Sequence, residues 1–346
     1  MNRQALLYKM TSVFIWAMYP VFIALGSSES SLAWFIVIVH ASAALGATLC
    51  GIMSLKSGKS ISTLKHLLLK LREQDIDRWI FIFAAGLCST LYNLCFLYAM
   101  VWTSKAGVAV IIETAPVYAM LLTSVIVTRN WESLGIKHAL VTALILIGVG
   151  LVVLADQKDI TRLFTDYDNY IRTGDFMSLM GCFVALIGSL MSALSDLMRA
   201  QAGNVTIRYI PSDSTRFDHE LTGIMFGEAI VRIVALPIAG LVLLVFNDVS
   251  VFSAKDTIYA FIAGFIIFNF GSITYAAALL KSNNPAIALL DYLSPPLSIF
   301  ILVLLGLSSL HPYLVIGTVM IIFGNLFLYL FDRKNVEPIA QTKHHP

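Results

Sequence analysis

Residues 106–127 read AGVAVIIETAPVYAMLLTSVIV, and nearly all of these side chains are apolar. A helix of about 20 residues spans the roughly 30 Å hydrocarbon layer of a bilayer, so this stretch has the length of a transmembrane helix. It nevertheless contains Glu113, an ionisable group, and Pro116, a helix breaker. Because a carboxylate at this depth costs about 2.5–3.5 kcal/mol on insertion scales, we expect Glu113 to face a polar interior and not lipid.

Similar apolar stretches recur along the whole chain of 346 residues, which is 58% hydrophobic and only 13% charged. Soluble domains carry about 25% charged residues. In lipid every backbone group must find its partner within a helix or a closed barrel, and segments of this length favour helices. The sequence predicts an all-α polytopic membrane protein with ten transmembrane helices at residues 10–27, 32–54, 79–101, 106–127, 136–154, 176–198, 221–246, 257–280, 285–307 and 312–331.

Lysines and arginines are distributed unevenly over the predicted loops. Most fall on the side of the N-terminus, including Lys9 ahead of the first span and the basic segment 55–78. The opposite loops hold only Lys105, Lys158, Arg162, Arg172 and Lys255. Because cytoplasmic loops are enriched in Lys and Arg, we expect a multi-pass protein of the cell inner (plasma) membrane with both termini cytoplasmic. The basic segment is interpreted as a topology signal, so we expect no nucleic-acid partner.

The chain repeats itself after five predicted helices. When Pro116 is aligned with Pro295, the surrounding segments match and Glu113 falls on Tyr292. Because five is an odd number, the second five helices must run upside down relative to the first. Secondary transporters commonly have such inverted repeats, with the substrate site near the midplane between them. The predicted division is a first repeat at 8–154, a second repeat at 176–331 and a cytoplasmic tail at 332–346.

Further motifs point to a known family. Glu132, near the end of the fourth predicted helix, is followed after 16 residues by Gly148. The second half has Gly317 and Gly324 at the corresponding places but Ser308 where a glutamate is expected. Together with the Ala-rich run before the proline, this pattern resembles the ten-helix, EamA-like branch of the drug/metabolite transporter superfamily. The resemblance covers residues 10–331 and implies a transporter and not an enzyme.

A closer resemblance concerns the second half. DYLSPPLSIFILVLLGLSSLHP, from Asp291, and the long predicted outer loop at 155–175 look most like the bacterial aromatic amino-acid exporters. Trp131, which stands where that pattern has glycine, is a departure. This resemblance implies export of an amino acid or a related compound.

Glu113 and Pro116 form the first candidate site. A proline removes one backbone donor from a helix, so Pro116 is expected to leave the carbonyl of Ile112 without its usual partner. A weakened helix beside a carboxyl group favours a substrate or proton site. The alternative is that Glu113 only bonds to a neighbouring helix.

The second half offers Asp291 and Tyr292, four and three residues before Pro295. Either residue is a candidate for contact with the substrate. The alternative is a packed tyrosine beside a structural acid. The two prolines are expected to break their helices at equivalent places.

Other candidates are scattered over five predicted helices. Glu228 and Arg232 share a helix face and can neutralise each other; the alternative is that Arg232 receives a substrate carboxylate. Trp16 and Tyr19 also share a face and either line an aromatic cavity or simply pack. Asp196 and Arg199 are assigned to the membrane interface. Asn93 and Asn269 carry amides at mid-span depth. Such amides are more often used for hydrogen bonds between helices than for ligand binding.

The sequence contains no P-loop, HExxH, GxSxG or dinucleotide-binding pattern, so ATP-driven transport and the common enzyme classes are not indicated. We expect a small-molecule substrate, the lipid bilayer and protons as partners, no cofactor and no metal site, and a monomer or homodimer. Two alternatives stay open. One is an efflux transporter of hydrophobic cations, and the other is a non-transporting lipid-handling or assembly protein, which a sealed apolar interior would favour.

Overall fold

The computed structural model describes residues 3–26, 32–54, 76–127, 135–156, 175–207, 216–246, 253–282 and 285–332. Every regular element within these ranges is helical, which confirms the all-α prediction. The elements are α1 (Arg3–Ala17), α2 (Tyr19–Gly26), α3 (Leu32–Ser54), α5 (Ile76–Trp102), α6 (Lys105–Ile111), η1 (Ile112–Thr114), α7 (Ala115–Leu122), η2 (Thr123–Val127), α8 (Ile136–Asp156), α11 (Asp175–Ile207), α12 (Arg216–Phe246), α13 (Ala254–Ile262), η4 (Ala263–Phe268), α14 (Asn269–Lys281), η5 (Pro285–Leu293), α15 (Ser294–Leu304) and α16 (Pro312–Asp332).

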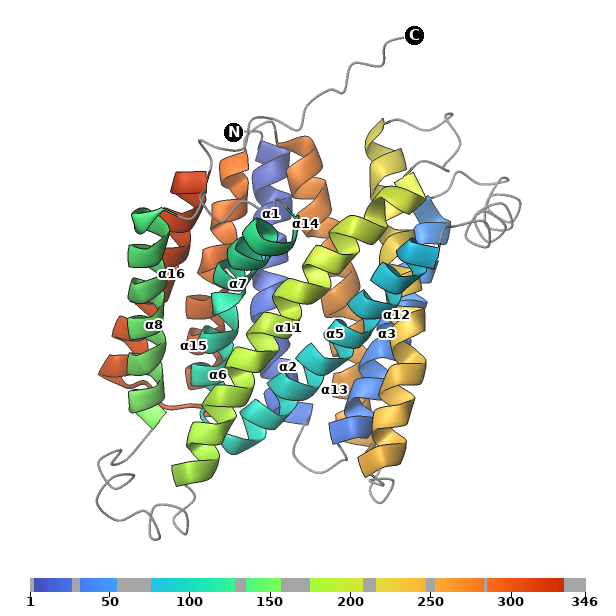
Figure 1. Ribbon diagram of the computed structural model, residues 1–346. Coiled ribbons are helices and arrows are strands. Elements are labelled where there is room, and N and C mark those ends of the chain that lie inside the picture. The colour runs from blue at the N-terminus through green and yellow to red at the C-terminus, as the bar shows by residue number, and fades with distance from the viewer. Residues whose placement is uncertain are drawn as a thin grey trace.

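Eight stretches of the described chain are long and apolar enough to cross a membrane, and two shorter apolar helices follow them at Leu290–Leu304 and Pro312–Leu328. The first five crossings, α1–α2, α3, α5, α6–α7 and α8, carry the chain to the opposite end of the bundle (Figure 1). The second series, α11 to α16, starts there and returns (Figure 1). The two series therefore run with opposite polarity. We call the end at which α1 begins the terminal side and the other end the far side.

The helix bounds agree with the predicted spans, and the difference that matters for function is at the start of the chain. α1 begins at Arg3 and not at residue 10, so Lys9 belongs to the helix and its side chain is fully buried. The assignment of Lys9 to a loop was wrong. Hydropathy alone marks a lysine as the end of a span, but a lysine with a buried partner of opposite charge is tolerated inside one. The division into repeats at 8–154 and 176–331 stays a prediction, and residues 333–346 of the predicted tail lie outside the described residues.

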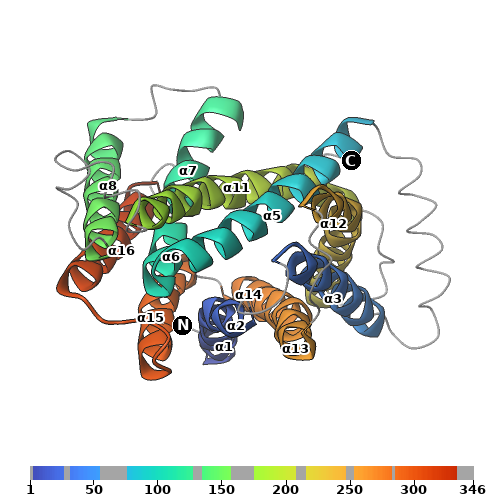
Figure 2. The same cartoon turned by 90° about the horizontal axis from the view of Figure 1, so that it is seen from below.

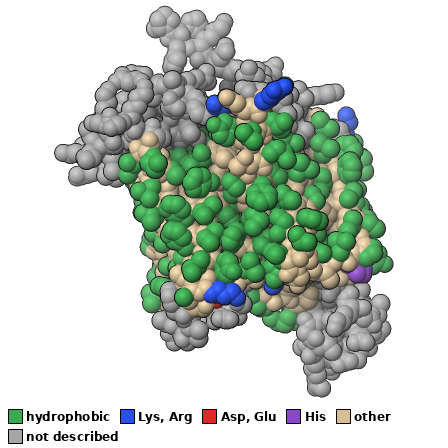
Figure 3. Space-filling model, turned by 180° about the vertical axis from the view of Figure 1, so that it is seen from behind, with side chains coloured by type: hydrophobic (Ala, Val, Ile, Leu, Met, Phe, Trp, Pro, Cys, Tyr) green, Lys and Arg blue, Asp and Glu red, His purple; other side chains and the backbone are tan. Residues whose placement is uncertain are grey.

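The outside of the bundle is apolar. Figure 3 shows hydrophobic side chains covering the visible face between the two ends, with the Lys and Arg side chains near the ends. Phenylalanines point outward along this surface, among them Phe14, Phe83, Phe183, Phe300 and Phe323. Soluble monomers rarely expose contiguous apolar patches larger than a few hundred Å². The belt is therefore the lipid-facing surface of a multi-pass membrane protein.

Both proline segments break their helices. Pro116 occupies the second position of α7, directly after the 3₁₀ turn η1. Pro295 occupies the second position of α15, directly after the 3₁₀ helix η5. Proline suits the first turn of a helix because the N–H that it lacks would have no intrahelical partner there. The candidate acids Glu113 and Asp291 both lie in these 3₁₀ segments.

Among the described residues, apolar side chains pack the far side of the bundle, and a cavity lies toward the terminal side. Toward the far side, where α2 ends and α3 begins, apolar side chains such as Ile23, Phe35, Met100, Val108 and Ile111 are buried against one another. α5 and α11 lie alongside each other (Figure 2), as do α8 and α16 at the edge of the bundle. The interior of the terminal side is lined by polar residues, and these form the candidate site.

Candidate functional site

A cavity of about 870 Å³ lies between the two series of helices. Its walls come from the middle of the crossings and from their parts nearer the terminal side, for example late in α11 and early in α12. The far side of the bundle is closed by the apolar core described above. The polar and charged lining residues are Tyr19, Ser89, Tyr92, Glu113, Ser192, Ser195, Asp196, Arg199, Glu228, Arg232, Ser272, Tyr275, Asp291, Ser294 and Ser298.

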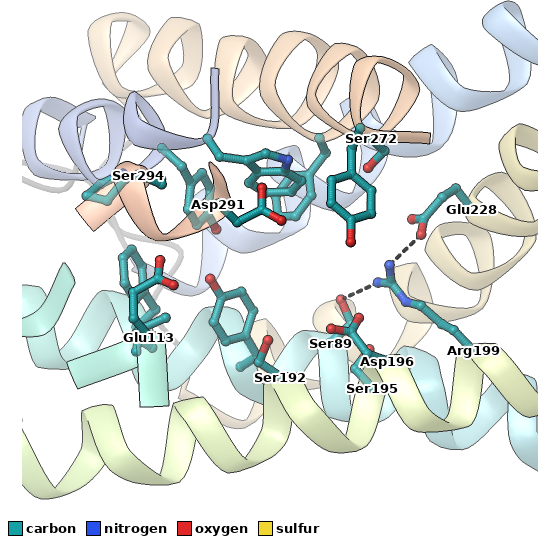
Figure 4. A pocket seen from close by; sticks show the side chains of 18 of the residues that line it. Ser89, Glu113, Ser192, Ser195, Asp196, Arg199, Glu228, Ser272, Asp291 and Ser294 are labelled. Atoms are coloured by element: carbon teal, nitrogen blue, oxygen red, sulfur yellow. Dashed lines mark hydrogen bonds and ion pairs between the residues drawn. The ribbon is translucent and has the colours of Figure 1, made fainter. Parts of the chain in front are cut away.

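Glu113 points into this cavity from η1 (Figure 4). Within the described part of the chain, its carboxyl group makes no hydrogen bond or ion pair, so it does not serve as a link between helices. Its backbone is held from the second series: Ser189 Oγ donates to the carbonyl of Ile112 at 3.0 Å, and Asn325 Nδ2 donates to that of Glu113 at 2.8 Å. Pro116 cannot supply the usual i+4 donor to the Ile112 carbonyl, as predicted, but this oxygen is not free, because Ala115 N–H and Ser189 Oγ both donate to it.

Asp291 faces the same part of the cavity from η5 (Figure 4). Its Oδ1 lies 2.5 Å from the Nζ of Lys9 on α1. The Lys9 side chain is 0% exposed, whereas that of Asp291 is 35% exposed. The Lys9 ammonium also lies 4.0 Å from the centroid of the Tyr275 ring, close enough for a cation–π contact. The carboxylate of Asp291 is thus exposed to the cavity, and its charge is neutralised by Lys9, which lies behind the cavity lining.

The other end of the cavity holds a cluster of two arginines around Glu228. Arg199 donates to the Glu228 carboxylate (Figure 4), and the Nε of Arg232 lies 3.5 Å from its other oxygen. Arg232 also donates to Ser89 Oγ at 2.9 Å, and its guanidinium lies 4.1 Å from the centroid of Phe268. The Arg232 side chain is 3% exposed and that of Arg199 is 22% exposed. Arg199 is therefore the more accessible of the two guanidinium groups.

Two sequence-based interpretations of this region change. Asp196 and Arg199, which were assigned to the membrane interface and lie at the end of the candidate span Phe176–Arg199, also line the cavity. The pair of Glu228 and Arg232 exists, but it is not self-contained, since Arg199 binds the same carboxylate. The reason is geometric: α11 crosses the bundle obliquely (Figure 1), so residues late in this helix return to the interior.

An aromatic wall connects the charged ends. Tyr19 stacks on Phe96 with centroids 5.4 Å apart and meets Phe268 edge-on at 5.1 Å. Trp16 meets Phe268 at 5.5 Å, and Tyr92 stacks on Phe96 at 5.9 Å. All five rings line the cavity. They present apolar faces to any occupant, while the charged groups lie at the two ends.

Of the predicted site residues, the cavity lining includes Trp16, Tyr19, Glu113, Arg232 and Asp291. The remaining ones lie behind it or beside it. Those with no place in the lining are Asn93, Asn269, Tyr292, Pro116 and Pro295.

The two amides support residues of the lining. Asn93 accepts a hydrogen bond from the hydroxyl of Tyr19. Asn269 directly follows the π-helical segment η4 and donates to the carbonyl of Phe265 at 2.9 Å. A π-helical turn leaves carbonyls out of the regular ladder, and this amide satisfies one of them. It thereby fixes the turn from which Phe268 enters the cavity.

Sequence reasoning missed Lys9, Asp196, Arg199 and Tyr275 as lining or supporting residues. One signal was present for Lys9. It lies seven residues before Trp16, which is about two helical turns and thus the same helix face. For the others, no pattern in the sequence shows which helices approach one another.

The lining can bind charge of either sign but has no feature of a metal centre. Within the described ranges, no group of three or more His, Cys, Asp and Glu side chains is arranged to hold a metal ion. The guanidinium of Arg199 suits a carboxylate, which arginine binds through a planar fork of donors. The carboxyl of Glu113 suits an ammonium group or a proton. The rings between them suit an apolar body.

Comparison with known proteins agrees with this geometry. Residues 3–154 match the EamA-like transporter family, which confirms the resemblance to the drug/metabolite transporter superfamily for this part of the chain. A crystal structure of a protein aligns with a TM-score of 0.57 over 96% of this chain and 100% of the other, at 14% identity, a level that shows the fold alone. No protein with a curated description matches the sequence. The matched family is one of membrane transporters of small molecules, which is consistent with the expectation of a transporter.

Proposed function

We propose, starting from the EamA-like transporter domain at residues 3–154, that the protein is a secondary transporter that exports an amino acid or a related small metabolite by alternating access. The observation that carries this proposal is the cavity between the two series of helices, which has an accessible arginine at one end and an unpaired carboxyl at the other. An amino acid carries both complementary charges on one small body. Export is inferred from the resemblance of the second half to amino-acid exporters.

Alternating access is supported by the asymmetry of the packing. The cavity extends toward the terminal side, while the far side is closed by apolar side chains. Two inverted halves have two packings of similar energy, each open to one side. If the termini are cytoplasmic, this structure is the inward-facing arrangement. Reporter proteins fused to both ends would test that orientation, and activity of a periplasmic reporter at either end would contradict it.

Transport itself is tested with purified protein in proteoliposomes loaded with a panel of amino acids and amines. We expect substrate-dependent efflux that responds to a proton gradient, because Glu113 is the lining group best placed to exchange a proton for a substrate. An absence of flux for every compound, with and without a gradient, would contradict the proposal. The Glu113→Gln variant is the matched control for leakage through the same protein.

A second candidate is an efflux transporter of hydrophobic cations, and the unpaired Glu113 among aromatic rings favours it. The accessible Arg199 favours amino acids instead, because a purely cationic occupant gains nothing from a guanidinium. Competition between amino acids and a cationic dye for the same flux separates the two. A lipid-handling protein is disfavoured by the fifteen polar and charged lining residues, since a sealed apolar interior was the feature that would have supported it.

A further inference from the structure

Lys9 is the feature of the cavity that the proposed function leaves unexplained. It lies on α1 inside a membrane crossing, and its side chain is 0% exposed. A charged ammonium removed from water costs several kcal/mol unless a partner compensates it. Its partner is Asp291, 2.5 Å away, and the Tyr275 ring lies against the same ammonium at 4.0 Å. Lys9 therefore belongs to the charge balance of the cavity although no substrate reaches it.

The charges that line the described part of the cavity balance almost completely. Lys9 neutralises Asp291, whose carboxylate is 35% exposed to the cavity. At the other end there are two guanidinium groups and two carboxyl groups: Arg199 and Arg232 both approach Glu228, and Asp196 lies in the same lining. Three cations thus stand against four acids, which leaves one excess negative charge. Glu113, whose carboxyl has no ion pair among the described residues, lies at the opposite end of the cavity from Arg199 (Figure 4).

We propose that Lys9 sets the charge selectivity of the cavity, which admits substrates with a single positive charge and rejects dications. This inference rests on the proposed function and deepens it by naming the substrate class as neutral amino acids and monoamines. Glu113 binds the one ammonium group of the substrate. A second ammonium near Asp291 meets a carboxylate that already has its counter-charge, and the Lys9 ammonium behind that carboxylate repels it. Such a repulsive element is a common basis of specificity.

Substitution of Lys9 by methionine removes the ion-pair partner of Asp291 and leaves its carboxylate uncompensated. Methionine is also unbranched, and its thioether packs well against an aromatic ring such as that of Tyr275. The Lys9→Met variant then has two uncompensated carboxylates facing one cavity (Figure 4). In the double variant Lys9→Met/Asp291→Asn, Glu113 is again the uncompensated carboxylate, because residue 291 no longer carries a charge. The pair of variants separates an effect of charge from an effect of altered packing.

The test measures binding of L-leucine, hexylamine and 1,6-diaminohexane to the purified full-length protein at pH 8. We expect the wild type to prefer hexylamine over the diamine by at least about tenfold. Lys9→Met should change this preference by at least about tenfold toward the diamine, and the double variant should restore it. A unit charge acting through an effective dielectric constant of about 20 over several ångströms exceeds the ~1.4 kcal/mol that tenfold represents. Lys281→Met is the control, since Lys281 contacts Gln4 outside the cavity lining.

Two results would overturn the inference while leaving the proposed function intact. One is a wild type that binds the amine and the diamine equally, a result that does not depend on any variant folding. The other concerns the variants. It is either a folded Lys9→Met protein whose preference for hexylamine over the diamine is unchanged, or a double variant that keeps the shift toward the diamine. A wild type that binds and transports none of the compounds would instead contradict the proposed function itself.

Discussion

The side-chain amide of Asn325, on α16, donates a 2.8 Å hydrogen bond to the main-chain carbonyl of Glu113, on η1. A helix of the second series thus holds the break in a helix of the first. Asn325 is 0% exposed, so this donor has no competition from water. The contact fixes the position from which the Glu113 carboxyl enters the cavity, and it joins the two halves that would move relative to each other in the proposed alternating-access cycle.

Replacing Asn325 by leucine keeps the approximate volume but removes the donor. We expect a loss of about 1–3 kcal/mol of stability, because the buried carbonyl of Glu113 is left without this partner. We also expect a several-fold slower flux, because η1 is less well fixed. Thermal unfolding in detergent and proteoliposome flux measure the two effects. Thr318→Val on the same helix is the control. Among the described residues the Thr318 hydroxyl bonds only to Leu314 of its own helix, so this substitution should be nearly neutral.

Glu113→Gln removes the ionisable group and keeps the shape of the side chain. We expect the folded protein to have an unchanged unfolding temperature to within a few degrees, because the carboxyl has no partner to lose among the described residues. Transport should fall at least about tenfold, since an amide cannot exchange a proton or pair with an ammonium group. Flux equal to that of the wild type would remove Glu113 from the transport site.

Glu228 and Arg232 offer a double-mutant cycle. Glu228→Gln leaves both neighbouring guanidinium groups without their carboxylate, and we expect a loss of about 3–5 kcal/mol, as for other buried pairs broken on one side. Arg232→Met should cost less, because Arg199 still compensates Glu228. The double variant should be more stable than the sum of the single losses by about 0.5–3 kcal/mol. If the two single losses of stability are strictly additive in the double variant, the 3.5 Å contact between Arg232 and Glu228 contributes no interaction energy.

Gly148 tests the contact between α8 and α16. A Cβ added there would lie 2.9 Å from the carbonyl oxygen of Gly317, whereas one at Gly150 meets nothing within 4 Å. We expect Gly148→Ala to lower the unfolding temperature, because the two backbones must separate. Gly150→Ala should leave it unchanged or raise it, since alanine favours a helix by about 1 kcal/mol over glycine. Equal effects of the two substitutions would show that α8 and α16 do not pack at this point.

Much of the fold could be predicted from the sequence because the bilayer imposes it. The lengths of the apolar stretches predicted the membrane crossings, and the two proline segments predicted the helix breaks beside Glu113 and Asp291. The odd number of helices per repeat gave the opposite polarity. Each of these features depends on composition or local geometry, which one stretch of chain carries by itself. The same logic placed Glu113 in a polar interior, since a carboxylate in lipid is too costly.

Only the tertiary structure decided which side chains meet. Lys9 was read as a loop residue because its partner, Asp291, is far away in sequence and comes from the opposite half. Arg199 was assigned to the membrane interface, and its place in the cavity lining depends on the tilt of α11, which the sequence does not show. The carbonyl of Ile112 was expected to lack its usual helix partner, and only the fold shows that Ser189 on another helix donates to it. Hydropathy is a sum over neighbours in the chain, whereas charge compensation and hydrogen bonding depend on neighbours in space.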